Sequence, residues 1–154
     1  MARIVRFHRT GGPEVLQIEE EASSPPGEGE VRIAVKAIGL NRAESLYRQG
    51  MYLESPSLPS RLGYEAAGTV EAVGKNVARF KPGDEVFGGA DGAVAQYVVV
   101  RETRGVALKP ANVTFEQAGS VGVAALTALQ GLRDHGGIKP GQKVLINGAS
   151  GGVG

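Results

Sequence analysis

Apolar and polar residues alternate along several short stretches of residues 1–108. In the clearest of them, 31–37, apolar residues stand at every second position, which is the period of a strand with one buried face. Glycine, proline, asparagine and serine, which favour turns, separate the stretches. The pattern predicts strands at 3–8, 15–20, 31–38, 66–73, 85–87, 94–100 and 105–108. The strands at 85–87 and 94–100 flank a glycine-rich loop, 88–92, and are predicted to pair with each other.

One short helix is predicted to interrupt these strands, at 42–49. It follows Asn41, and Asn41 with Glu44 three residues later has the spacing of a capping box. The residues after it, 51–61, contain two prolines and three serines and predict an irregular loop.

The pattern changes at Thr114, which forms a second capping box with Gln117. Apolar residues then recur at helical spacing over 115–132, and a short apolar run at 143–147 predicts a strand buried on both faces. A helix that leads into a buried strand is typical of a parallel α/β sheet. The predicted domains are residues 1–112 and residues 113–154.

Glycines at 148, 151 and 154 follow the predicted strand with the spacing G-x-x-G-x-x-G. Glycine permits a sharp turn, and without a Cβ it lets a pyrophosphate approach the backbone at the start of the next helix. The motif needs a strand, a glycine turn and a helix together, so a flexible glycine-rich tail is the alternative. The preceding strand favours the phosphate-binding loop.

The composition of the 154 residues is that of a globular protein, with 42% hydrophobic and 21% charged residues. The net charge is +1, which gives no electrostatic reason to expect nucleic acid or an anionic membrane as a partner. No cysteine is present, so disulfides, thiolate zinc sites and cysteine nucleophiles are excluded. We therefore expect a cytoplasmic protein.

Taken together, several motifs resemble the zinc-independent quinone oxidoreductase branch of the medium-chain dehydrogenase/reductase superfamily. They lie at 11–15, 39–41, 47–52, 63–70, 80–87, 126–127 and 148–154. The resemblance implies a mixed α/β fold, with an N-terminal GroES (chaperonin-10)-like β-barrel domain followed by the first helix and strand of a truncated Rossmann domain. It also implies that the chain is an N-terminal fragment, inactive alone, of an enzyme expected to form a homodimer at full length.

The resemblance bears on metal binding through two positions. Zinc-dependent relatives hold a catalytic metal through a cysteine just after the strand at 31–38 and through a histidine in a Gly-His-Glu motif. Here the first position falls within 39–44, which has no sulfur, and the second is Tyr64. Asparagine and tyrosine do not replace thiolate and imidazole as zinc ligands. We therefore expect no metal site and no zinc.

Individual residues carry the family's expected roles. Asn41 matches an asparagine near the nicotinamide and the substrate, with the helix cap as an equally favoured and compatible role. Tyr52 matches a cleft tyrosine that could donate to a carbonyl, and Tyr64 either donates or fills the vacated zinc position. Tyr47 is a neighbouring candidate, so the proton donor stays open among the three. Glu65 matches an acid interpreted as a buried structural carboxylate.

Further residues are expected to hold the cofactor. Thr127 matches a threonine near the nicotinamide carboxamide, and a helix hydroxyl bonded back to a carbonyl is the equally favoured alternative. The expected pyrophosphate contacts are Gly151, Gly152, Val153 and Gly154. NADPH is the expected cofactor and NADH the alternative. The residue that distinguishes them follows the loop by about 20 positions, which is beyond residue 154.

These residues suggest an NADPH-dependent, zinc-independent enzyme that transfers hydride to quinones or to activated alkenes and enones. Without a Lewis acid, an electron-poor acceptor suits the site. One alternative is an enoyl-thioester reductase with a tyrosine as proton donor. The other, of a different class, is a non-catalytic cofactor-binding or structural relative.

Overall fold

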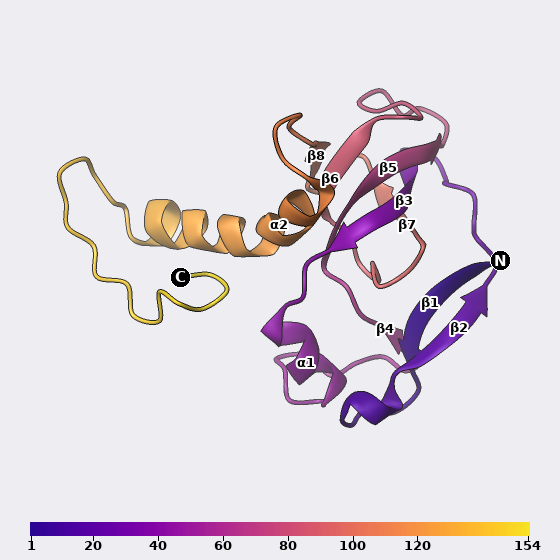
Figure 1. Ribbon diagram of the computed structural model, residues 1–154, viewed down its shortest axis with the longest axis horizontal. Coiled ribbons are helices and arrows are strands. Elements are labelled where there is room, and N and C mark those ends of the chain that lie inside the picture. Colours follow the sequence, from indigo (N-terminus) through magenta and orange to yellow (C-terminus); the bar gives the residue numbers. More distant parts are fainter.

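The computed structural model describes residues 1–154 and consists of a β domain from which one long helix projects (Figure 1). The strands are β1 (Ala2–Phe7), β2 (Gln17–Glu21), β3 (Glu30–Ile38), β4 (Ser60–Arg61), β5 (Glu65–Val73), β6 (Glu85–Gly89), β7 (Tyr97–Arg101) and β8 (Val106–Leu108). The helices are α1 (Arg42–Arg48) and α2 (Phe115–Gln130), with a 3-10 turn at Pro13–Val15 and a π-helical turn at Gly131–His135. No helix has both the length and the apolar character that crossing a bilayer requires.

The strands form two sheets, which backbone hydrogen bonds join to each other. One sheet has the order β2-β1-β4 and the other the order β7-β3-β5-β6-β8. The backbone of β1 also bonds the segment just before β7, where the N–H of Val5 donates to the carbonyl of Val94 at 2.9 Å and the N–H of Gln96 donates to the carbonyl of Arg3 at 3.0 Å. These bonds join the sheets into the barrel-like domain that the resemblance implied.

The predicted pairing of the strands at 85–87 and 94–100 is wrong. Strand β6 lies between β5 and β8, whereas β7 pairs with β3. The intervening segment does not turn back as a hairpin, because its N–H groups are used elsewhere: Gly92 donates to the carbonyl of Gly63 at 2.9 Å and Val94 to that of Leu62 at 3.0 Å. The chain therefore passes from β6, near one edge of the five-stranded sheet, to β7 at its other edge.

The alternating residues at 31–37 form a strand with one buried face, as predicted. Val31 and Ile33 of β3 are 0% and 2% exposed, and they belong to the main hydrophobic core with Val70 of β5 and Val86 of β6. Each fully buried aliphatic side chain contributes about 1.5–3 kcal/mol to folding. This core fixes the central strands that carry the candidate site at their ends.

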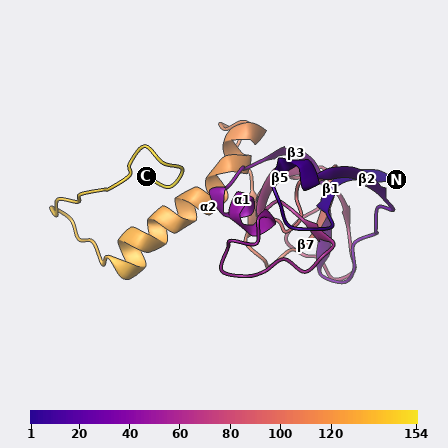
Figure 2. The same ribbon diagram turned by 90° about the horizontal axis from the view of Figure 1, so that it is seen from below.

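Helix α2 begins at the predicted Thr114–Gln117 capping box, in which the N–H of Gln117 donates to Oγ1 of Thr114 at 3.2 Å. Its first half packs against β3, β5 and β6, with Ala118 and Gly119 buried. Its second half projects away from the β domain (Figures 1 and 2), and Leu126 there is 54% exposed.

The predicted strand at 143–147 does not form. Its residues have no strand assignment, and Leu145 is 96% exposed. A buried parallel strand obtains its hydrogen bonds from strands on either side, and none lies beside this segment. The glycine turn does form, with the N–H of Gly151 donating to the carbonyl of Gly148 at 2.9 Å.

Candidate active site

The start of α1 is held in place by Glu44, which is 5% exposed. Its Oε2 accepts from the backbone N–H of Asn41 at 2.9 Å, which confirms the predicted capping box at the start of the helix. Its Oε1 accepts from the N–H of Gly63 at 2.5 Å. One carboxylate therefore joins the beginning of α1 to the backbone next to Tyr64.

Three tyrosines come together beside this link. Tyr47, Tyr52 and Tyr64 line one pocket of about 460 Å³, whose wall also includes Gly63 and Arg61. The hydroxyl of Tyr47 is held by Oγ of Ser60 at 3.1 Å, whereas those of Tyr52 and Tyr64 make no hydrogen bond within the chain. The pocket therefore offers two uncommitted phenol hydroxyls to a polar ligand.

The environment of Tyr64 favours its neutral form. Burial raises the pKa of the Tyr64 phenol above its usual value of 10.0, and the negative charge of Glu44 raises it further, followed by smaller effects of the neighbouring tyrosines and Glu54. A neutral phenol can donate a hydrogen bond at neutral pH.

We expect Tyr64 to titrate above pH 10.0, because the folded chain disfavours the phenolate. Its contribution to stability is fully present below the pKa of the unfolded chain, about 10, and is lost as the pH rises through the raised folded pKa. An NMR titration of ring-labelled tyrosine measures this, with Tyr64→Phe assigning the resonance. A Tyr64 resonance that titrates at or below the usual value would contradict the expectation.

Asn41 does not line the tyrosine pocket. It borders an adjacent hollow with Leu40, Ser45 and Leu62. Its Nδ2 donates to Oε1 of Glu65 at 3.0 Å. Glu65 follows Tyr64, so this bond connects Asn41 to the tyrosine pocket. Asn41 and Tyr64 themselves line different pockets.

Glu65 is buried, as predicted, with 2% exposure. Its second oxygen, Oε2, accepts from the backbone N–H of Val123 in α2 at 2.8 Å. This contact was not predicted, because the two residues lie 58 positions apart and nothing in the local sequence of α2 marks Val123 as a partner.

The predicted cofactor residues lie away from the tyrosines. Thr127 is exposed on α2, and its Oγ1 donates to the carbonyl of Val123 at 2.7 Å, which is the alternative role considered for it. Residues 151–154 are exposed. Neither Thr127 nor these residues line the tyrosine pocket. Their cofactor roles stay predictions.

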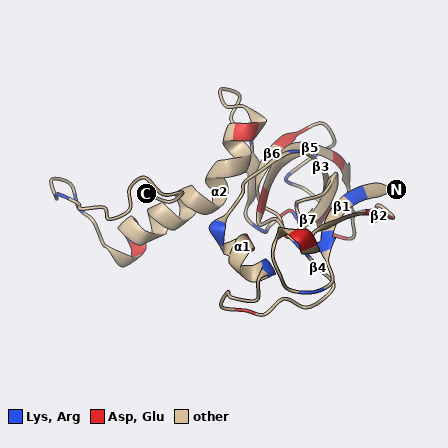
Figure 3. Ribbon diagram, turned by 60° about the horizontal axis from the view of Figure 1, so that its bottom comes forward, with Lys and Arg blue, Asp and Glu red and all other residues tan.

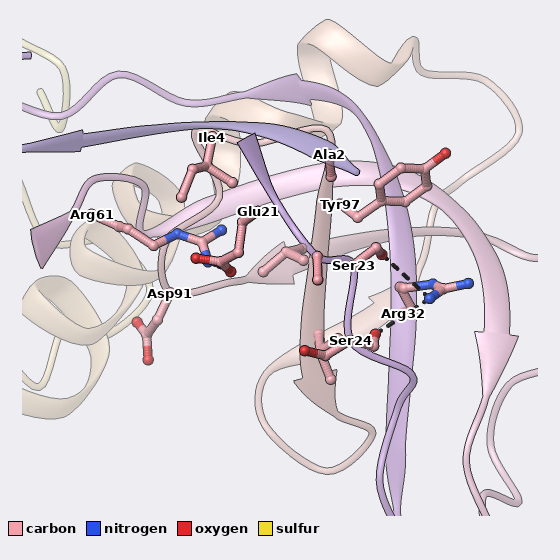
Figure 4. A pocket seen from close by; sticks show the side chains of 12 residues that line it. Ala2, Ile4, Glu21, Ser23, Ser24, Arg32, Arg61, Asp91 and Tyr97 are labelled. Carbon is pink, nitrogen blue, oxygen red and sulfur yellow. Dashed lines mark hydrogen bonds and ion pairs between the residues drawn. The ribbon is translucent and has the colours of Figure 1, made fainter. Parts of the chain in front are cut away.

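A second polar pocket lies at the open end of β1 and β2 (Figure 4). Arg32 donates there to Oγ of Ser23 and to the carbonyl of Ser24, each at 3.3 Å, and Arg61 faces Glu21 at 3.4 Å. Of the predicted site residues, none lines this pocket. Acidic and basic residues are interspersed over the β domain (Figure 3), and both kinds line each of the two pockets.

No group of three or more His, Cys, Asp or Glu side chains is placed to hold a metal ion. Of the positions that the resemblance relates to zinc ligands, Tyr64 lies in the tyrosine pocket, and the stretch 39–44 includes Asn41, whose amide is bonded to Glu65. The absence of zinc stays a prediction.

Comparison with known proteins identifies the family. Residues 27–111 match the alcohol dehydrogenase GroES-like domain, and the chain belongs to this family. Among its relatives, the quinone oxidoreductase of Pseudomonas aeruginosa is 44% identical over 100% of the chain, which covers 47% of that protein. The resemblance to the quinone oxidoreductases of the medium-chain superfamily is thereby confirmed. The division between residues 112 and 113 stays a prediction.

Two solved structures show the same arrangement. A crystal structure of Escherichia coli quinone oxidoreductase complexed with NADPH superposes with a TM-score of 0.80 and 39% identity, covering 91% of this chain and 43% of that one. A crystal structure of CurK enoyl reductase gives a TM-score of 0.91 and 28% identity, covering 99% of this chain and 48% of that one. The chain spans about half the length of the curated relatives it matches.

Proposed function

We propose that the natural full-length protein transfers hydride from NADPH to quinones or to activated enones, without zinc. The observation that carries this proposal is the gathering of Tyr47, Tyr52 and Tyr64 in one pocket beside the Asn41–Glu65 pair. The relatives named above as quinone oxidoreductases support the choice of acceptor, and the NADPH complex of one of them supports the cofactor.

The residues present fit such a cofactor. Gly148 has a φ of +78° and turns the backbone, and a Cβ at Gly152 would meet nothing within 4 Å, so a phosphate can approach the chain there. Bound NADPH would supply the hydride. We assign the pyrophosphate contacts to residues 151–154 and the nicotinamide contacts to Asn41 and Thr127.

The phenols supply polar contacts to the acceptor. We propose that the hydroxyl of Tyr52 donates to the carbonyl of the acceptor, because it makes no hydrogen bond within the chain and the residue, which lines the pocket, is 40% exposed. Tyr64, which is less exposed than Tyr52, forms part of the pocket wall. The hydroxyl of Tyr47 is already held by Ser60 at 3.1 Å.

An enoyl-thioester reductase is the second candidate function. The structural similarity to CurK enoyl reductase favours it, and the same tyrosines would then protonate the reduced carbon. A cofactor-binding protein without turnover is the remaining alternative. We also propose a cytoplasmic homodimer that binds neither nucleic acid nor membrane, in keeping with the net charge of +1 and the absence of cysteine.

Oxidation of NADPH by the natural full-length protein tests these candidates when quinones and enoyl thioesters are supplied separately. Turnover with quinones or simple enones is the expected result. Turnover with enoyl thioesters alone would support the second candidate. Binding of NADPH without oxidation in the presence of any acceptor would overturn both and favour the non-catalytic protein.

A further inference from the structure

Glu65 is the first residue of β5, and its side chain bonds two distant parts of the chain. Its Oε1 accepts from Nδ2 of Asn41 at 3.0 Å, and its Oε2 accepts from the backbone N–H of Val123 at 2.8 Å. Both oxygens accept hydrogen bonds, as those of an ionised carboxylate do. The carboxylate therefore links the residue before α1 to the middle of α2.

The contact with Val123 reaches the backbone of α2. In a regular helix the N–H of Val123 donates to the carbonyl of Gly119, and here Oε2 of Glu65 competes for this N–H at 2.8 Å. A side chain inserted among these bonds is a recognised cause of helix kinks. Figures 2 and 3 show α2 as two segments that meet at an angle. We attribute this bend to Glu65.

Two glycines leave space for the carboxylate. A Cβ on Gly39 would lie 2.0 Å from Oε1 of Glu65, and a Cβ on Gly122 would lie 2.9 Å from Oε2. The side chain is 2% exposed, so water cannot replace either contact without a rearrangement. The geometry at these positions therefore depends on both glycines and on the carboxylate together.

We infer that Glu65 is a positioning residue that sets the place of Asn41 relative to Thr127. Thr127 lies one helical turn beyond Val123 and bonds its carbonyl at 2.7 Å, so a change in the bend of α2 moves Thr127 directly. The consequence for the cofactor rests on the proposed function, in which Asn41 and Thr127 contact the nicotinamide.

The variant Glu65→Gln tests this inference with little change in shape. A glutamine side chain offers one acceptor and one donor, whereas both groups that face residue 65 are N–H donors. The present pair of contacts therefore cannot be kept unchanged. Either the Val123 amide loses its acceptor, or the amide of Asn41 turns over.

A second substitution restores the pairing. In Glu65→Gln combined with Asn41→Asp, the glutamine oxygen accepts from Val123 and its Nε2 donates to the new aspartate, which is also a good helix cap. Asn41→Asp alone places a carboxylate against Glu65 and is expected to destabilise the chain. The pair of exchanges therefore forms a double-mutant cycle.

The experiment has two readouts. Hydrogen exchange of the Val123 amide and the side-chain amide resonance of Asn41, measured by NMR in the 154-residue chain, report the link itself. The KM for NADPH and the kcat, measured in the natural full-length protein, report its consequence. We expect Glu65→Gln to change one of the NMR signals and to raise the KM about tenfold or more. In the double variant, the KM for NADPH is expected to rise by less than the product of the two single increases.

The matched control is Glu71→Gln on the same strand. Glu71 is 43% exposed and pairs with Nε of Arg32 at 2.7 Å, away from α2, so its loss should leave the KM for NADPH unchanged. NMR signals that are unaffected by Glu65→Gln, or single effects that simply multiply in the double variant, would overturn the link. An unchanged KM and kcat in Glu65→Gln would overturn the positioning role.

Failure of the proposed function has a different signature. Wild-type full-length protein that does not bind NADPH would overturn that function and the cofactor role of Glu65 with it, even where NMR confirms the link. Binding of NADPH by the wild type, with both the Val123 and the Asn41 signals unchanged in Glu65→Gln, would overturn the link alone.

Discussion

Replacing Gly63 with alanine is expected to lower the free energy of unfolding by about 3–5 kcal/mol. Gly63 has a φ of +112°, in a region that side chains disfavour, and a Cβ there would lie 2.4 Å from the backbone nitrogen of Ala93 and 2.7 Å from that of Val94. These atoms cannot move aside freely, because the N–H of Val94 is bonded to the carbonyl of Leu62 at 3.0 Å.

The control for this substitution is Gly83→Ala. Gly83 has a φ of +93°, but a Cβ there would meet nothing within 4 Å, so only the backbone conformation opposes alanine. We expect a loss of about 1–2 kcal/mol. Urea denaturation of both variants and the wild type measures the difference. Equal losses in the two variants would show that close packing at Gly63 does not contribute.

The location of Gly63 makes the same substitution a test of the site. The residue precedes Tyr64, and its N–H donates to Oε1 of Glu44 at 2.5 Å. A shift of the backbone here would loosen the start of α1 and move the ring of Tyr64 in the pocket. We expect the raised pKa of Tyr64 to fall towards its usual value in this variant, because burial is the largest cause of the shift.

Local patterns predicted those parts of the fold that local forces decide. The alternation at 31–37 identified β3, because one face of that strand fills the core with Val31 and Ile33. The capping boxes identified the starts of α1 and α2, because each depends on residues only three positions apart. Strand pairing depends on distant partners, and the partner of 97–101 is β3, far along the chain.

The same distinction explains the two errors. The run at 143–147 has strand composition, but composition alone does not form a strand without neighbouring backbones to bond. The glycines at 88–92 resemble a hairpin turn, but the N–H groups of residues 90, 92 and 94 bond the carbonyls of 62–64 instead. Local sequence cannot reveal either outcome.

The candidate site divides in the same way. Tyr52, Tyr64 and Asn41 were identified through their matches to family motifs, and the structure places the tyrosines in one pocket. The burial of Glu65 was also predicted, whereas its contact with Val123 depends on how α2 docks against β5. Residue identity therefore predicted the chemical groups, and tertiary packing determines which of them act together.

Replacing Tyr52 with phenylalanine is expected to lower kcat/KM for the quinone or enone by about 100-fold in the natural full-length protein. The substitution removes only the hydroxyl, which makes no hydrogen bond within the chain, and the residue is 40% exposed, so stability should change little. Loss of NADPH absorbance at varied acceptor concentration measures the effect, and a thermal unfolding curve checks the fold.

Tyr97→Phe is the matched control for Tyr52→Phe. Tyr97 lies on β7 outside the tyrosine pocket, where the guanidinium of Arg32 lies 5.8 Å from the centre of its ring, and its substitution should leave kcat/KM unchanged. A large loss in Tyr64→Phe with none in Tyr52→Phe would transfer the donor role to Tyr64. Because the pKa of Tyr64 is raised, its phenol stays protonated at neutral pH and would be available to donate to the carbonyl of the acceptor.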